Sequence, residues 1–117
     1  MLFLWLKAFA LTVLVEEAVA VPLLHAAEPR GWRRAAVVFF ANLASHPAVW
    51  FVFPLLGLSY PSMLWLAEAW AVVIEAIFYA VVFAGAPKRR LLGVALLANG
   101  ASWTIGNVVR GATPWLG

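Results

Sequence analysis

Four long apolar runs, separated by three short turns, limit what this chain can fold into more than any other feature of its sequence. The runs cover about residues 2–27, 35–58, 61–85 and 91–109. Each is close to the ~20 apolar residues that an α-helix needs to cross the hydrocarbon core of a bilayer. We therefore predict an all-α integral membrane protein: one membrane domain, residues 1–117, with four antiparallel transmembrane helices in a small bundle.

Composition agrees with a membrane protein and excludes several other classes. Apolar residues make up 66% of the chain and charged residues 11%, whereas a soluble domain is about half apolar and about a quarter charged. The chain has no cysteine, which excludes disulfides and thiolate metal sites. Its cationic residues form no stripe interleaved with aromatics, so we expect no nucleic-acid partner. We also find no convincing internal repeat.

The charges of the turns predict one orientation in the membrane. Cations lie in two of the three turns: Arg30, Arg33 and Arg34 in the first, and Lys88, Arg89 and Arg90 in the third. Loops that stay in the cytoplasm carry an excess of lysine and arginine. We therefore expect residues 28–34 and 86–90 to be cytoplasmic and both termini to face outward, in a bacterial inner membrane.

Polar side chains inside the apolar runs mark the candidate site. Ionisable groups are costly in a bilayer and normally face a bundle interior or cavity. We estimate depth at ~1.5 Å of rise per residue from the cytoplasmic end of each helix. By this measure six polar side chains, four of them ionisable, fall within one narrow range of depth. We call this set the polar layer and predict that it binds an ion or a proton: Glu16, Glu17, Asn42, His46, Glu75 and Asn99.

All four helices contribute to the polar layer, and further residues are expected around it. Neighbouring residues on a helix point ~100° apart, so only one of Glu16 and Glu17 can face the bundle axis squarely, and the sequence leaves open which. Pro47 cannot bond the carbonyl of Leu43, which frees that oxygen at the same depth. The expected pocket-lining residues are Trp50, Tyr79, Ser102 and Trp103.

Two further charged residues, Lys7 and Glu68, lie in the outer half of the bundle at similar depth. Either charge alone would be expensive there, so we predict a structural ion pair between the first and third helices. This pair is separate from the polar layer.

Three functions are compatible with this pattern. The first is ion- or proton-coupled transport of a small solute, by a homo-oligomer or together with partner membrane subunits, because four helices enclose little volume. The second is an accessory subunit of a larger membrane complex, whose polar layer fixes helix packing. The third is an intramembrane hydrolase with a metal ion on His46, Glu17 and Glu75. A single histidine supplies too few ligands for a typical metal site, so we favour a protein that is not an enzyme and has no cofactor. The sequence does not identify the substrate.

Overall fold

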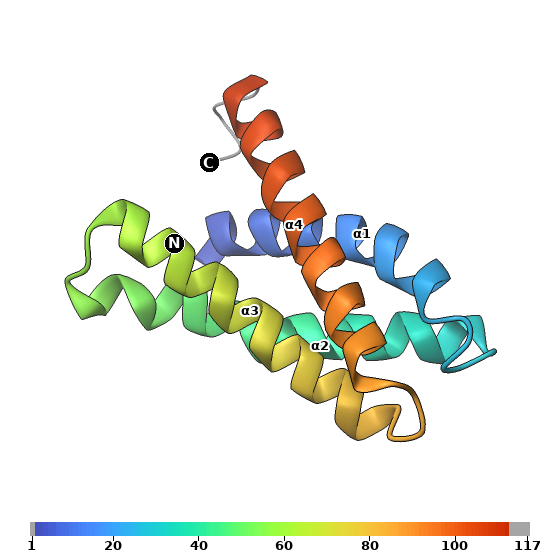
Figure 1. Ribbon diagram of the computed structural model, residues 1–117. Helices are drawn as coiled ribbons and strands as arrows, with labels where there is room; N and C mark the ends of the chain where they lie inside the picture. Colours follow the sequence, from blue (N-terminus) through green and yellow to red (C-terminus); the bar gives the residue numbers. More distant parts are fainter. Residues whose placement is uncertain (1, 113–117) are drawn as a thin grey trace.

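The computed structural model describes residues 2–112, and this part of the chain is helical, with no strand. Four α-helices follow one another along the chain, with one short 3₁₀-helix, η1, in the second turn (Figure 1). Their bounds are α1 Leu2–Leu23, α2 Gly31–Phe51, η1 Phe53–Leu56, α3 Tyr60–Val82 and α4 Lys88–Ala112. The prediction of an all-helical chain with four helices is confirmed.

Each helix packs beside two others: α1 and α3 both contact α2 and α4. The α1–α2 and α3–α4 turns lie at one end of the molecule, and η1 lies at the other (Figure 1). The longest dimension is 39 Å, which compares with ~30 Å for the hydrocarbon core of a bilayer. The two arginine-rich turns predicted to share a side of the membrane are therefore neighbours in the fold.

Three of the helices are long and apolar enough to cross a membrane: α2 together with η1, α3, and α4 as far as Val109. α1 has 22 residues, but every stretch of it long enough for a span contains Lys7, Glu16 and Glu17. Large apolar side chains also face outward; Leu55 is 81% exposed and Val81 is 73% exposed. Soluble proteins rarely expose large contiguous apolar patches, so this surface is consistent with an integral membrane protein.

Small side chains line the inside of the bundle. Ala20, Ala41, Ala95 and Ala98 have no exposed surface, and such small residues let helices approach closely. Larger side chains fill the space between them toward the arginine-rich end: Leu24, Val38, Tyr79, Phe83 and Leu91.

The helix ends differ from the predicted spans, and prolines account for part of the difference. α1 ends at Leu23, directly after Pro22, rather than near residue 27. The span predicted to reach residue 58 is divided, because α2 ends at Phe51 and Pro54 lies in the first turn of η1. Proline fits a first helical turn, where its missing N–H is not needed. η1 then ends at Gly57, whose φ of 70° is a conformation that glycine adopts without strain.

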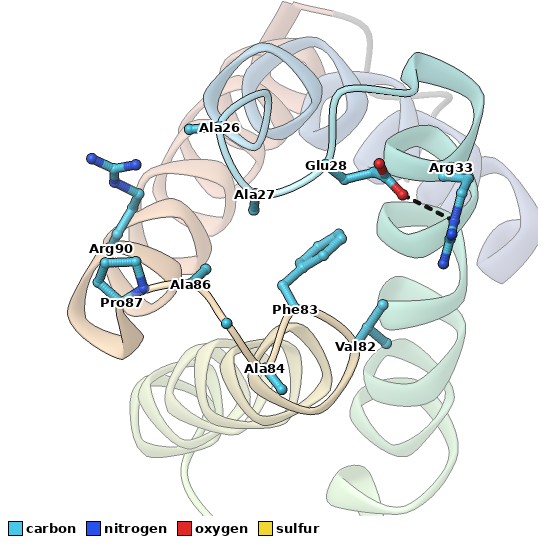
Figure 2. A pocket seen from close by; sticks show the side chains of 11 residues that line it. Ala26, Ala27, Glu28, Arg33, Val82, Phe83, Ala84, Ala86, Pro87 and Arg90 are labelled. Carbon is cyan, nitrogen blue, oxygen red and sulfur yellow. Dashed lines mark ion pairs between the residues drawn. The ribbon is translucent and has the colours of Figure 1, made fainter.

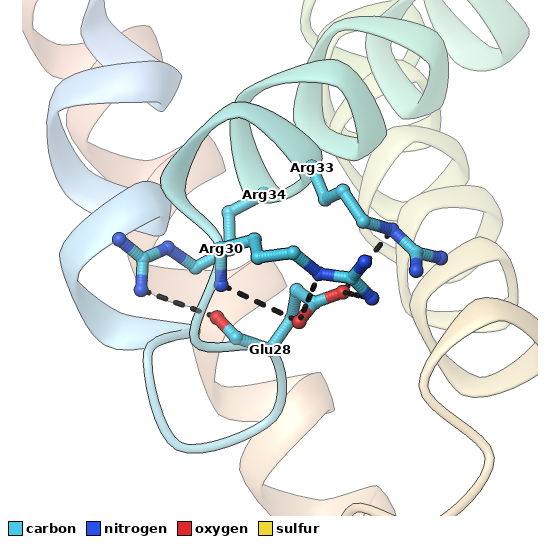
Figure 3. Close-up of polar contacts among 4 residues, drawn as sticks. All are labelled: Glu28, Arg30, Arg33 and Arg34. Atoms are coloured by element: carbon cyan, nitrogen blue, oxygen red, sulfur yellow. Dashed lines mark hydrogen bonds and ion pairs between the residues drawn. The ribbon is translucent and has the colours of Figure 1, made fainter.

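One carboxylate organises the turn between α1 and α2. Glu28 Oε1 lies 3.2 Å from Arg30 Nη2 and 3.1 Å from Arg33 Nε, and Arg34 Nη1 donates to the Glu28 backbone oxygen at 3.2 Å (Figure 3). Burial opposes ionisation, but the hydrogen bonds from Arg30 and the charges of Arg30 and Arg33 hold the pKa of Glu28 below its usual value. The arginines of this turn are thus held in place by an acid within it.

Candidate functional site: a buried carboxyl pair

Two carboxyl groups meet in the middle of the bundle. Glu16 on α1 and Glu75 on α3 are both 0% exposed, and their side chains lie within hydrogen-bonding reach of each other. Glu17 is only half-buried. The question that the sequence left open is therefore answered: Glu16 is the first-helix glutamate that faces inward. We call Glu16 and Glu75 the carboxyl pair.

The other two helices surround the carboxyl pair with neutral polar groups. Ser102 Oγ lies 3.2 Å from Glu16 Oε2 and 3.1 Å from the Asn99 backbone oxygen, so its single proton has two acceptors within reach. Ser45 Oγ likewise lies 3.5 Å from Glu75 Oε2 and 3.3 Å from the Asn42 backbone oxygen. The side chains of Asn42 and Asn99 lie close to Glu16 and Glu75, respectively, although their amides donate to carbonyls of their own helices. Each carboxyl group therefore has one asparagine and one serine beside it. For Glu16 the asparagine belongs to α2 and the serine to α4, and for Glu75 the helices are exchanged.

This arrangement rests on a repeat that sequence analysis did not find. The segment Ala-Asn-x-Ala-Ser occurs at residues 41–45 of α2 and again at residues 98–102 of α4. Asn42 Nδ2 donates to the Val38 backbone oxygen at 2.9 Å, and Asn99 Nδ2 makes the same bond to Ala95 at 2.8 Å. The hairpins α1–α2 and α3–α4 thus present matching polar groups to a shared centre, with one glutamate from the first helix of each.

Several oxygens at this centre lack a hydrogen-bond donor. Glu16 Oε1, Glu75 Oε1, Asn42 Oδ1 and the Tyr79 hydroxyl oxygen are all buried without a partner. Among residues 2–109, whose side chains the structure describes, neither carboxyl group forms an ion pair with a lysine, arginine or histidine. Two adjacent buried carboxyls are costly to ionise together. The chemistry that suits this cluster is the binding of a proton or a small cation.

His46 is not part of this cluster. Trp5 Nε1 donates to His46 Nδ1 at 3.0 Å, and the Phe9 ring lies 5.4 Å from the imidazole. His46 therefore faces the outer half of α1, although it directly follows Ser45. In the described part of the chain, no three histidine or glutamate side chains are close enough to hold a metal ion. The ligand set His46, Glu17 and Glu75 is thus not brought together.

Lys7 and Glu68 do not form the expected ion pair; no such contact is found among residues 2–112. The Lys7 ammonium lies 4.8 Å from the centre of the Phe3 ring, one turn earlier on α1. A lysine and an aromatic ring one turn apart on the same helix can contact each other whatever the helix packs against. This local contact was not predicted.

The residues expected to line a pocket beside the polar layer lie in different parts of the bundle. Tyr79 is fully buried beside the carboxyl pair, one turn along α3 from Glu75. Trp50 is half-buried, and Trp103 is 45% exposed. Trp103 lines a separate pocket of about 210 Å³ between α3 and α4, together with Pro61, Leu64, Trp65, Glu68 and Gly100.

Ser45 and Trp70 complete the site and were not assigned to it from sequence. Ser45 follows Asn42 by three positions and so lies on the same helix face, which is the signal in the sequence that could have identified it. Trp70 Nε1 donates to the Ser45 backbone oxygen at 3.0 Å. No local signal identified Trp70, because its partner lies on another helix.

Comparison with known proteins adds no assignment. Searches of protein-family models, of curated proteins and of solved structures found no match to this chain. Function is therefore argued from the site itself.

Proposed function

We propose that this chain is an integral membrane protein that couples the movement of a proton, or of another small cation, to transport of a small solute. The carboxyl pair Glu16 and Glu75 carries the proton. The single observation behind this proposal is that two carboxyl groups with no exposed surface face each other and have only neutral partners.

Burial and proximity together give the carboxyl pair its chemistry. A charge in a low-dielectric core is costly, and a second charge beside it is costlier still. The pair therefore holds at least one proton at neutral pH, and the serine hydroxyls can donate to the single negative charge that remains. Loss of the last proton requires a cation to replace it, which is the exchange that a coupled transporter needs.

The proposal requires all four helices to cross the membrane, α1 included. α1 buries Glu16 inside the bundle, so this charge-bearing group is not presented to lipid. The two arginine-rich turns then face the cytoplasm. A second copy of the chain or partner membrane subunits would complete the transport pathway.

The pocket between α3 and α4 supports a place for the solute. Its lining includes one carboxyl group, Glu68, and the aromatic side chains of Trp65 and Trp103. Aromatic faces and a carboxylate both attract cations. Small organic cations are therefore the first solutes to test.

A structural role for the polar layer, in an accessory subunit, is the second candidate. Hydrogen bonds between membrane helices contribute only about 0.6–2 kcal/mol each, yet they can specify packing. The asparagine amides favour transport over this role, because each amide already bonds a carbonyl of its own helix. Two buried carboxyls are also an expensive choice for a purely structural contact.

The test is solute-dependent proton movement in proteoliposomes that contain a pH indicator. A panel of small organic cations is added under an imposed pH gradient. Wild type is expected to move protons with at least one of them, and Glu75→Gln and Glu16→Gln are expected to lose this movement. Glu17→Gln is the matched control, because that side chain is half-buried and outside the pair.

Proton movement that survives in both Glu75→Gln and Glu16→Gln would refute the assignment of the carboxyl pair. If wild type moves no proton with any solute while both variants lose thermal stability, the structural role is favoured instead.

A further inference from the structure

A second cavity lies at the arginine-rich end of the molecule, away from the carboxyl pair. It has a volume of about 360 Å³ and opens between the α1–α2 turn and the α3–α4 turn (Figure 2). Its charged lining residues are Glu28, Arg33 and Arg90, and its apolar wall includes Val82 and Phe83. Nothing in the proposed transport chemistry uses this cavity.

The two arginines occupy equivalent places in the repeat. Arg33 precedes Asn42 by nine positions, and Arg90 precedes Asn99 by nine positions. They come from opposite sides of the cavity (Figure 2). The repeat thus places one guanidinium from each hairpin at the same opening.

The two arginines are repeated, but their acidic partners are not. Among the described side chains, one arginine of the cavity, Arg90, therefore has no carboxylate bound to it. Glu28 binds Arg33, but it also binds Arg30, so one carboxylate is shared by two guanidinium groups. Arg90 is exposed and forms no ion pair with any other residue between positions 2 and 112. The opening therefore has an excess of positive charge.

The backbone adds to this excess. α4 has 25 residues and begins at Lys88, directly after the lining residues Ala86 and Pro87. The first turn of a helix has unpaired N–H groups and the positive end of the helix dipole, which together favour an anion.

We propose that this cavity binds the phosphate-bearing head group of an anionic phospholipid. Arg33, Arg90 and the first turn of α4 hold the phosphate, and the glycerol and upper acyl chains lie along Val82 and Phe83. The apolar wall favours a lipid over free phosphate, because free phosphate would gain nothing from it. Cytoplasmic leaflets are also where anionic lipids and basic side chains meet. This assignment uses the membrane orientation proposed above but not the transport activity.

The test is retention of lipid by the purified full-length protein in native mass spectrometry, after exchange with equal amounts of phosphatidylglycerol and phosphatidylcholine. Wild type is expected to retain phosphatidylglycerol preferentially. Arg90→Gln should weaken this retention by roughly tenfold, since it removes a charge-assisted hydrogen bond to the phosphate. Arg89→Gln is the matched control, with the same charge change one position away on a side chain that does not line the cavity.

Three results would overturn the proposal. Equal retention of both lipids by wild type would exclude a site for anionic head groups. Equal losses in Arg89→Gln and Arg90→Gln would indicate diffuse attraction to a basic surface. Thermal stabilisation by inorganic phosphate, with none from phosphatidylglycerol, would indicate a free anion as ligand. Glu75→Gln is expected to retain the lipid normally, so failure of the transport proposal is distinguished from failure of this one.

Discussion

The five acidic residues of this chain are all glutamates, and their surroundings divide them by role. Glu28 binds two arginines in a turn, and Glu17 and Glu68 are partly exposed. Only Glu16 and Glu75 are fully buried, and each lies within hydrogen-bonding distance of a serine hydroxyl. A carboxyl group that binds arginine stays ionised, whereas one among neutral donors can gain and lose a proton.

Glu28 gives a pH-dependent prediction at the residue scale. Its pKa is lowered in the folded protein relative to its usual value of 4.5. Its stabilising contribution is therefore present above that value and is lost as the pH falls through the lowered folded value. In a detergent solution, wild type should melt at a higher temperature than Glu28→Gln at neutral pH. The two melting temperatures should converge as the solution is made acidic, and a difference that grows on acidification would contradict the role given to Glu28.

For the residues of the site, the sequence predicted depth in the membrane better than it predicted the direction in which each side chain points. Depth along each helix could be counted, and it brought Glu16, Asn42, Glu75 and Asn99 together correctly. The direction in which each side chain points around its helix could not be predicted accurately enough to distinguish neighbouring residues. His46 was assigned to the polar layer because its estimated depth falls within the same range, but its imidazole accepts a hydrogen bond from the indole of Trp5 instead. Glu16 and Glu17 could be distinguished only once α1 was packed.

At the scale of elements, the repeated hairpin accounts for how the site is assembled. α1–α2 and α3–α4 each supply a glutamate, an asparagine and a serine, and each carboxyl group has polar neighbours from both hairpins. The repeat is hard to recognise in the sequence because the two halves share only the short Ala-Asn-x-Ala-Ser segment, and the apolar residues around it differ. Any apolar side chain of suitable size can face lipid, so those positions carry little information.

The repeat predicts matched effects of matched substitutions. Ser45→Ala and Ser102→Ala each remove one hydroxyl donor from the carboxyl pair. Each should lower the free energy of unfolding by about 1 kcal/mol, in the range measured for hydrogen bonds between membrane helices. Thr104→Ala is the control, because this exposed hydroxyl bonds only the Gly100 oxygen of its own helix.

Urea or detergent unfolding of the purified variants gives this comparison. A Thr104→Ala loss as large as the two serine losses would show that the carboxyl pair gains nothing special from its hydroxyl donors.

Helix number and type could be predicted from the sequence, since four apolar runs between polar turns permit few alternatives. The ends of the helices could not be predicted as well. α2 begins four positions earlier than the expected span, at Gly31, because its first turn extends beyond the apolar run and carries Arg33 and Arg34. Apolarity marks the part of a helix that suits lipid, whereas the helix itself continues through residues that suit water.

At the scale of the whole molecule, the shared end of the two arginine-rich turns predicts one orientation. The chain has no cysteine, so a single introduced thiol reports its own side of the membrane. Leu58→Cys lies in the turn after η1, and Gly85→Cys lies in the turn before α4; both positions are exposed. In intact cells, a membrane-impermeant maleimide should label Leu58→Cys and should label Gly85→Cys only after permeabilisation. The reverse pattern would contradict the proposed orientation.

The most direct test of the whole account is whether the carboxyl pair holds a proton at neutral pH. Infrared spectroscopy of the protein in lipid distinguishes a protonated carboxyl group from a carboxylate. Wild type should show a protonated carboxyl band at neutral pH, and the double variant Glu16→Gln with Glu75→Gln should lose it. A wild-type spectrum without this band, or a band of equal intensity in the double variant, would contradict the account.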